Sequence, residues 1–314
     1  MHADKQNALT SDAKLDASDR YTVVMVTYNS AHLLDRCFER LRGGVSTLIV
    51  DNASKDKSVS KIREVAPHAS ILVNGFNEGF GKAANRALHE VETEFAILVS
   101  PDCLVEQSTI EQLIILADRW DSAAIISPIL VEEDGNKTRC HDQDLFSREE
   151  ISRSRKDEPF PSGDLCAGFV QNAVSLLRMK ALKKTGLFDE NIFLFYEDDD
   201  LCIRLRRDGW SLVLAPNLLA IHLSGTSSNL SRALLIRRRY YHMAWSRLYL
   251  EAKYRGRSRG FVLGITNFIL FLGKLFSALI TLNRTKITRD MARVEGTFDF
   301  LCGFSSCRSK ESKK

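Results

Sequence analysis

The sequence predicts an α/β fold in which a mostly parallel, doubly wound sheet carries helices on both faces. Between residues 21 and 102, short apolar runs rich in β-branched residues alternate with segments of helical periodicity, which is the pattern of successive βαβ units. Two of the apolar runs end at an aspartate, Asp51 and Asp102. Because ligands of such sheets bind beyond the carboxyl ends of the strands, these aspartates are the first indication of a functional site.

The first elements follow one another closely. The run 21–27 is apolar and β-branched, as expected of a strand buried on both faces. Ser30 is placed to cap a following helix, which the glycine pair 43–44 ends. A second strand is expected over 47–51. The pattern then repeats, with helices expected over 58–66 and 79–91 and strands over 70–73 and 95–99.

The rest of the chain divides into regions of different composition. Residues 131–162 are polar and irregular and predict a surface excursion, after which regular structure is expected to resume over 165–177. An apolar strand is expected from Ser211. We therefore expect three parts: a flexible tail over 1–20, a globular α/β domain over 21–230 and a basic and apolar helical extension over 231–314.

Composition excludes several classes of protein. The 314 residues are 44% hydrophobic and 27% charged, as in an ordinary globular protein, and a net charge of +4 is too small to indicate a nucleic-acid partner. The seven cysteines are odd in number and contain no Cys-x-x-Cys pair, which favours reduced thiols over disulfides or zinc. The polar N-terminus lacks the apolar core of a signal peptide, so the bulk of the chain is expected in the cytoplasm.

The C-terminal region combines a basic block with an apolar segment. Residues 231–259 contain nine Arg or Lys against one acid, Glu251, which suits an anionic cytoplasmic membrane surface. Residues 261–280 are about as long as the roughly 20 residues that span a bilayer. Asn267 and Lys274 share one helical face and are costly in lipid, so an interfacial helix fits as well as a span. The alternative is a buried core helix beside a solvated basic face.

Polar and glycine-rich segments follow two of the strands. Asp51-Asn52-Ala53-Ser54 can bind a base or ribose, or form an ordinary turn and helix cap. The segment Asn77 to Asn85 places two glycines at the start of a helix, where the backbone can approach a phosphate closely. It matches neither the dinucleotide fingerprint nor a phosphate-binding Walker loop. A simple turn before a helix explains it equally well.

Two further positions suit a metal site. Asp102 directly follows a strand, and Mg²⁺ or Mn²⁺ commonly binds one or two carboxylates together with substrate phosphates. Such an ion neutralises a diphosphate leaving group. His222 follows an apolar strand and can be a ligand carried by a loop. A turn aspartate and a structural histidine are the alternatives.

The run Glu197-Asp198-Asp199-Asp200 is the strongest functional signal. Acids at a helix N-terminus suit the helix dipole, and Asp200 can pair with Arg204 one turn later. Four adjacent acids repel one another, which raises a carboxyl pKa toward the range of a general base. Helical spacing places Glu197 and Asp200 on one face and the two acids between them elsewhere.

Taken together and in order, these motifs resemble the family 2 inverting glycosyltransferases of GT-A fold, and especially their bacterial rhamnosyltransferase-like branch. The resemblance covers about residues 21–245, and the basic and apolar tail also resembles that branch. The matching pieces are Val26 to Asn29, Val50 to Ser54, Asn77 to Gly81 with Asn85, Ser100-Pro101-Asp102, Glu197 to Leu201 with Arg204, and His222 with Gly225 and Ser227.

The resemblance implies a role for each nucleotide-site residue. It places a nucleotide pocket at the end of the first strand and flanks the nucleotide sugar with the glycine loop. The residues concerned are Thr27, Tyr28 and Asn29 in the pocket, Asp51 on the base, and Asn77, Gly79, Phe80, Gly81 and Asn85 beside the sugar.

The resemblance also implies the catalytic groups. Asp102 would hold the metal, Mg²⁺ or Mn²⁺, and the diphosphate, with His222 as a further ligand. Asp198 would be the base that deprotonates an acceptor hydroxyl, with Glu197 beside it. The family's Asn-Pro-Asp is Ser-Pro-Asp here, and Asp199 stands where the branch often has a small apolar residue.

These roles imply partners and a location. The branch favours a deoxyhexose such as rhamnose, carried on dTDP or UDP and transferred to a glycan or polyprenyl-linked acceptor in cell-surface polysaccharide synthesis. The expected location is the cytoplasmic face of the bacterial inner membrane, peripheral or anchored at the C-terminus. One alternative is a sugar nucleotidyltransferase, although the segment after the first strand, residues 27–30, lacks that class's glycine-rich loop. The other is a non-catalytic membrane assembly protein on the same scaffold.

Overall fold

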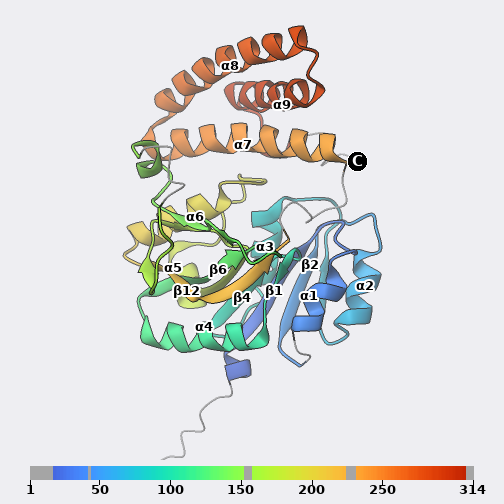
Figure 1. The fold of residues 1–314 in the computed structure, drawn as a ribbon, viewed down its shortest axis with the longest axis vertical. Helices are drawn as coiled ribbons and strands as arrows, with labels where there is room; N and C mark the ends of the chain where they lie inside the picture. Colours follow the sequence, from blue (N-terminus) through green and yellow to red (C-terminus); the bar gives the residue numbers. More distant parts are fainter. Residues whose placement is uncertain (1–16, 42–43, 152–157, 224–230, 309–314) are drawn as a thin grey trace, which may run out of the picture.

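A mixed ten-stranded sheet with helices on both faces forms the body of the protein, and three long helices lie together beyond one end of it (Figure 1). The structure is a computed structural model, and it describes residues 17–41, 44–151, 158–223 and 231–308. The strand order is β3-β2-β1-β4-β11-β6-β12-β5, with β7 and β9 paired to its outer part. The α/β class predicted by the sequence is confirmed.

The first half of the sheet is parallel, as the alternating pattern predicts. Its strands are β1 (Tyr21–Thr27), β2 (Thr47–Asp51), β3 (Ser70–Val73) and β4 (Phe95–Val99), joined by α1 (Leu34–Arg40), α2 (Ser58–Val65) and α3 (Phe80–Leu88). The expectation that Ser30 caps α1 is wrong. The helix begins four residues later, at Leu34, without a side-chain cap, and the Ser30 hydroxyl instead accepts a hydrogen bond from the Tyr28 amide.

The second half of the sheet is mixed, because β11 runs antiparallel between β4 and β6. Parallel pairing is found again between β6 and β12, so the sheet is parallel chiefly among β1 to β4, the strands from the N-terminal part of the chain. The elements are β5 (Cys103–Leu104), α4 (Gln107–Arg119), β6 (Ala123–Val131), β11 (Val174–Arg178), α5 (Met179–Thr185), α6 (Glu197–Arg207) and β12 (Ser211–His222).

The excursion expected over residues 131–162 contains more regular structure than its composition indicates. Within its described part are β7 (Lys137–Thr138), β8 (His141–Asp142) and η2 (Ser147–Glu149), followed by β9 (Leu165–Cys166) and β10 (Phe169–Val170). Strands of two residues carry too little periodicity to be recognised in a sequence.

Two apolar layers hold the sheet between its helices. One contains side chains of α1, α2 and α4, including Leu34, Ile62 and Leu113, and the other contains side chains of α3, α5 and α6. Both faces of β4 are buried. Because both faces are covered, polar groups of the sheet reach a ligand only at the strand ends, and the site is expected there.

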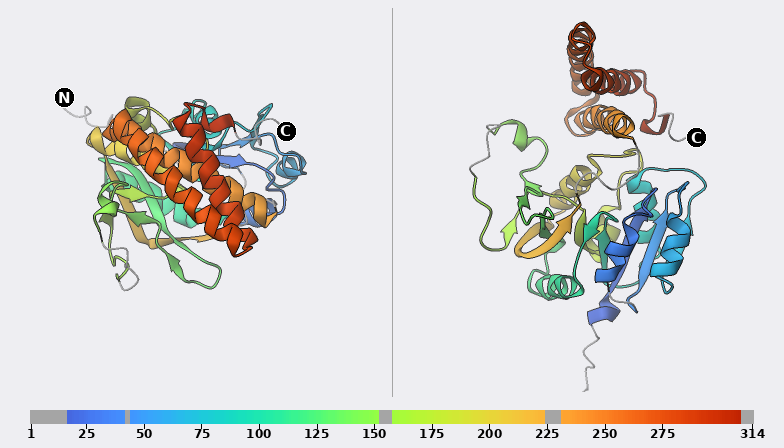
Figure 2. Two further views of the ribbon diagram at one scale, coloured as in Figure 1. Left: turned by 90° about the horizontal axis from the view of Figure 1, so that it is seen from above. Right: turned by 45° about the vertical axis from the view of Figure 1, so that its right-hand side comes forward.

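The C-terminal helices form a separate stack. They are α7 (Arg232–Arg255), α8 (Arg257–Ile280) and α9 (Arg284–Leu301), followed by η3 (Ser306–Arg308). Figure 2 shows α7 nearest the sheet and α8 with α9 beyond it. By length and composition alone α8 could cross a membrane, and only 11% of its most apolar window is buried. The alternative of a buried core helix is therefore wrong, since most of its apolar side chains face outward.

The structure describes the first of the two expected domain boundaries but not the second. Residues 17–20, expected in a flexible tail, form the 3-10 helix η1, and Arg20 bridges the carboxylates of Glu94 and Asp118 at 2.7 Å each. The boundary expected near residue 230, together with Gly225 and Ser227 of the last motif, lies outside the described residues.

Candidate active site

A cavity of about 590 Å³ lies at the end of the sheet where β1 and β4 terminate, between those strand ends and α7. Its wall combines three carboxylates, two arginines, a histidine and three aromatic rings with several amides. Its residues are Val26, Tyr28, Ser30, Asn52, Phe80, Ser100, Pro101, Asp102, Gln171, Asn172, Ala173, Leu194, Phe195, Glu197, Asp198, His222, Leu235, Arg238 and Arg239. Six predicted site residues are among them: Tyr28, Phe80, Asp102, Glu197, Asp198 and His222.

The first two acids of the predicted run open helix α6 and face this cavity. The two residues before them, Phe195 and Tyr196, have positive φ angles of 63° and 71°. Non-glycine residues adopt this conformation at an energetic cost, which is commonly found at functional sites. The turn directs the start of α6, and with it Glu197 and Asp198, into the cavity.

Asp198 is held by Asn172, which follows β10. The Asn172 side-chain amide donates to one carboxylate oxygen at 3.1 Å, and its backbone amide donates to the other at 3.3 Å. Burial raises the pKa of the Asp198 carboxyl to about 6, against the opposing effect of these hydrogen bonds. Near neutral pH the carboxylate is therefore ionised but still basic enough to accept a proton.

Glu197 is the more buried of the two acids, with 7% of its surface exposed. Burial and the neighbouring Asp198 raise the pKa of its carboxyl well above the ordinary value. Its Oε2 atom has no hydrogen-bond partner among the described residues, and neither has Oδ1 of Asn172. Buried polar atoms are normally paired, so these atoms indicate that polar ligand groups complete this wall.

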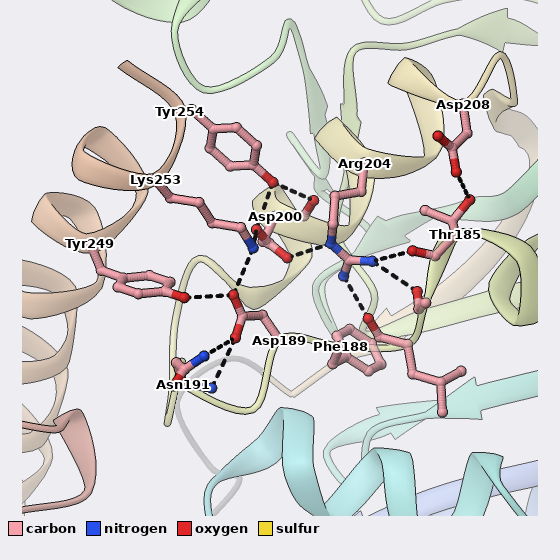
Figure 3. Close-up of polar contacts among 12 residues, drawn as sticks. Thr185, Phe188, Asp189, Asn191, Asp200, Arg204, Asp208, Tyr249, Lys253 and Tyr254 are labelled. Carbon is pink, nitrogen blue, oxygen red and sulfur yellow. Dashed lines mark hydrogen bonds and ion pairs between the residues drawn. The ribbon is translucent and has the colours of Figure 1, made fainter. Parts of the chain in front are cut away.

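The last two acids of the run point away from the cavity and are paired with cations. Asp199 forms an ion pair with Arg148 of η2. Asp200 is fully buried and accepts from Arg204 at 2.7 Å, as its spacing predicts, and also from Lys253 and Tyr254 of α7 (Figure 3). The predicted pairing of Asp200 with Arg204 is confirmed. Glu197 and Asp198 both line the cavity although helical spacing places them on different faces of α6, because the cavity lies at the N-terminus of this helix.

Asp102 and His222 meet at the edge of the sheet although 120 positions separate them in sequence. Strand β5 pairs with β12 in a register that sets His222 opposite Cys103, and this brings His222 Nε2 within 3.6 Å of Asp102 Oδ2. Ligand atoms of Asp102, Cys103 and His222 lie within 4.8 Å of one another. Burial raises the pKa of the Cys103 thiol well above its usual range.

Several residues expected to contact the nucleotide lie just behind the cavity wall. The Thr27 hydroxyl donates to Asp51 at 3.1 Å, and both residues are buried. Asp51 also accepts the backbone amide of Ser54 at 2.9 Å, while Asn29 donates its amide to the Ser54 hydroxyl at 2.8 Å. These bonds tie the turns after β1 and β2 together, so Thr27, Asn29 and Asp51 shape the floor beneath Tyr28.

The glycine loop, residues 77–81, also supports the cavity wall. The Asn77 side chain accepts from the Asn52 amide and from the Gly79 backbone, each at 3.0 Å. Gly79 has φ +87°, and a Cβ at this position would lie 2.4 Å from the backbone oxygen of Phe193. The glycine is therefore required where α3 meets the loop before α6. Asn52 belongs to the motif 51–54 but not to the predicted site residues, and it lines the cavity itself.

Asn85 and Gly81 fix the same loop from inside α3. The Asn85 side chain donates to the backbone oxygen of Phe188 and accepts from its amide, each at 2.9 Å. A Cβ on Gly81 would lie 3.0 Å from the Phe188 side chain. Neither residue lines the cavity, and both position the segment that leads to Glu197.

Sequence reasoning missed the contribution of α7. Leu235, Arg238 and Arg239 of this helix line the cavity, and the Arg238 guanidinium lies 5.2 Å from the centre of the Tyr28 ring. From sequence alone, the basic block 231–259, which contains both arginines, is assigned to a membrane surface. Nothing in the local sequence distinguishes an arginine that faces lipid from one that faces a ligand. The amides of Gln171 and Asn172 were also missed, since they follow a two-residue strand.

The fold and this strand-end cavity define the GT-A class of transferases, and comparison with known proteins is consistent with it. The mannosyltransferase PcManGT from Pyrobaculum calidifontis, solved with GDP-Man and Mn²⁺, superposes with a TM-score of 0.53 over 90% of this chain and 87% of its own, at 15% identity. GalNAc-T7, solved with UDP, GalNAc and Mn²⁺, gives a TM-score of 0.50 over 73% of this chain and 50% of its own, at 13% identity. These likenesses establish the fold.

Sequence comparison identifies the family. The profile described as "Glycosyl transferase family 2" matches residues 22–186, more than half of the chain. The protein belongs to glycosyl transferase family 2.

Its relatives include two rhamnosyltransferases. An N-acetylglucosaminyl-diphospho-decaprenol L-rhamnosyltransferase of Mycobacterium tuberculosis is 26% identical over 234 residues, covering 65% of this chain and 76% of the relative. The dTDP-rhamnosyl transferase RfbF of Shigella flexneri is 23% identical over 212 residues, covering 65% and 69%.

Proposed function

We propose that this glycosyltransferase moves a sugar with inversion from a nucleoside-diphosphate donor to a glycan or polyprenyl-linked acceptor. One observation carries the proposal: a single cavity holds the Asp102–His222 pair on one side and the carboxylates of Glu197 and Asp198 on another. A transfer of this kind needs a group that binds the diphosphate and a separate base for the acceptor, and the cavity offers both.

Asp102 and His222 are the residues that would hold a divalent cation. Their carboxylate and imidazole suit Mn²⁺ and, through the oxygen, Mg²⁺, and leave coordination positions for diphosphate oxygens. When bound, such an ion neutralises charge on the leaving diphosphate. The Mn²⁺ in both structural neighbours supports this assignment.

Asp198 is the base in this proposal. Its carboxylate takes the proton from an acceptor hydroxyl as the hydroxyl oxygen attacks the anomeric carbon. The bond from that carbon to the diphosphate oxygen breaks, and the electron pair leaves with the diphosphate. Attack from the opposite face inverts the anomeric centre in one displacement. Asn172 orients the carboxylate through its two hydrogen bonds, and Glu197 lies beside it.

The relatives guide the choice of donor and acceptor. We propose a deoxyhexose such as rhamnose on dTDP, with a UDP sugar as the alternative donor, because two relatives are named as rhamnosyltransferases and one of them as using dTDP. The mycobacterial relative is named for a decaprenyl diphosphate acceptor. A polyprenyl-diphosphate sugar is the corresponding acceptor for this chain, with a role in cell-surface polysaccharide synthesis.

Helix α8 supports an acceptor held at a membrane. Phe261, Ile269, Phe276 and Ile280 are between 50% and 69% exposed along its outer side. An uncovered apolar surface of this kind favours lipid, and the many arginines around it favour an anionic leaflet. We propose that α8 binds the cytoplasmic face of the membrane, either in its plane or as an anchor.

A panel of nucleotide sugars tests the proposal directly. The melting temperature of the full chain is measured with dTDP-rhamnose, UDP and GDP sugars, each with and without Mn²⁺. We expect a rise with at least one donor that is larger when Mn²⁺ is present and is lost in Asp102→Asn. If no donor raises the melting temperature and Mn²⁺ changes nothing, the proposed reaction is wrong. Donor hydrolysis by the wild type that is absent in Asp198→Ala would exclude a non-catalytic scaffold.

A further inference from the structure

Helix α7 supplies the two cationic side chains in the described wall of the cavity, Arg238 and Arg239. Three carboxylates face them across the same cavity, those of Asp102, Glu197 and Asp198. A donor diphosphate, and an acceptor diphosphate as well, must enter a site in which acids are numerous. A divalent cation at Asp102 and His222 would leave the carboxylates of Glu197 and Asp198 uncompensated, and without further cations such a site repels a diphosphate.

The three consecutive arginines of α7 are directed to different surroundings. Arg237 pairs with Glu295 of α9 at 2.7 Å, away from the cavity. Arg238 lies over Tyr28, the aromatic residue at the end of β1. Arg239 is exposed at the cavity wall and forms no ion pair with any residue that the structure describes. Arg237 therefore points away from the cavity, whereas Arg238 and Arg239 line it.

Helix α7 is fixed relative to the acids of α6 by partly buried polar contacts. Lys253 lies between Asp189 and Asp200, at 2.6 and 2.5 Å, and Tyr254 donates to Asp200 at 2.7 Å (Figure 3). Nearer the cavity, the Ser246 hydroxyl donates to the backbone oxygen of Leu194 at 3.1 Å. These bonds hold α7 against both α6 and the loop before it, so the arginine positions are set before any ligand binds.

We propose that Arg238 and Arg239 bind the diphosphate of a substrate, so that the C-terminal helices complete the active site in addition to meeting the membrane. The inference rests on the proposed function, since it assumes that a diphosphate enters this cavity. Guanidinium groups suit this ligand because their planar donors bind phosphate oxygens in pairs. The diphosphate belongs either to the nucleotide donor or to the polyprenyl acceptor.

The first arm of the test concerns the donor. Isothermal titration of the full chain with UDP, dTDP, UMP and dTMP in the presence of Mg²⁺ compares the wild type with Arg238→Gln/Arg239→Gln. We expect the double variant to bind the diphosphates about 10- to 100-fold more weakly, the effect of losing charge-assisted hydrogen bonds, and the monophosphates nearly unchanged. Arg237→Gln removes the same charge one residue earlier and is expected to bind like the wild type.

The second arm concerns the acceptor and uses farnesyl diphosphate as its probe, with farnesol as the uncharged control. Loss of farnesyl diphosphate binding in the double variant, with nucleotide binding intact, assigns the arginines to the acceptor diphosphate. If the wild type and the double variant bind every diphosphate equally, the inference is overturned but the proposed function is not. Failure of the wild type to bind any of these ligands overturns the proposed function as well. Thermal unfolding of each variant verifies that the fold is intact. Arg238→Lys/Arg239→Lys preserves the charge and serves as a second control in the same measurement.

Discussion

The two halves of the acidic run differ completely although their residues are neighbours. Glu197 and Asp198 face a cavity, and Oε2 of Glu197 and Oδ1 of the adjacent Asn172 have no hydrogen-bond partner among the described residues. Asp199 and Asp200 are held by cations from η2, α6 and α7. The helix dipole favours an acid at all four positions. Position at a helix start therefore does not show whether an acid is available for chemistry. The side chains that surround each acid decide this, because an acid paired with a cation has a structural role.

Replacing the proposed base should have the largest effect. Asp198→Asn preserves the shape of the side chain and can keep one of the two hydrogen bonds from Asn172, but it cannot accept the acceptor proton. We expect kcat for sugar transfer to fall about 10²- to 10⁴-fold, the usual contribution of a general base. Release of nucleoside diphosphate in the presence of acceptor measures it. A variant that retains more than a tenth of the wild-type kcat would show that the base lies elsewhere in the run.

Replacing Asp200 should affect stability instead. Asp200→Asn leaves the cations of Arg204 and Lys253 facing a neutral group in a buried position, and breaking such a pair costs about 3 kcal/mol of unfolding free energy. Denaturation in urea measures the change. Because α7 is attached through the same carboxylate, loss of stability should accompany exposure of α7 to proteolysis. An unchanged unfolding midpoint would mean that the network contributes nothing to α7 docking.

The pH dependence of transfer should report the acids of the first half. The pKa of Asp198 is raised to about 6 by burial, and the base must be ionised to accept a proton. We expect kcat/KM to fall about tenfold per pH unit below about 6 and to level off above it. A profile between pH 4.5 and 8.5 tests this. The matched control Asp199→Asn should keep the acid limb and lower its midpoint slightly, because it removes a negative charge beside Asp198.

Replacing Asp199 should have the smallest effect at neutral pH. Asp199→Asn keeps the side-chain shape, and Arg148 is exposed enough to be solvated, so we expect a change of about 1 kcal/mol in unfolding free energy. Burial raises the pKa of Asp199 to about 7, and a raised carboxyl pKa gives stability that is present below the unfolded value and lost as pH rises through 7. The variant should therefore lose less stability between pH 6 and 8 than the wild type, as measured by thermal unfolding.

Local sequence pattern was sufficient for the first half of the fold. The strands β1 to β4 and their helices were predicted because buried parallel strands are apolar runs of limited length and the helices between them carry a period of 3.6 residues. The antiparallel placement of β11 was not predicted, because the direction of a strand depends on where the chain returns. The structural role of Asn77 and Asn85 was not predicted either. Their hydrogen bonds to Gly79 and Phe188 can be recognised only in the folded structure.

The sequence by itself determined the family, the strand ends that carry Asp51 and Asp102, and the presence of an acidic turn that contains the proposed base. Each of these depends on residue type and short spacing. The family resemblance implied that Asp102 and His222 share a site, and the tertiary structure shows the strand register that brings them together. Only the tertiary structure decided that the first two acids face the cavity and the last two do not, and that α7 adds two arginines to its wall. These facts depend on contacts between residues tens of positions apart, and no local pattern specifies such contacts.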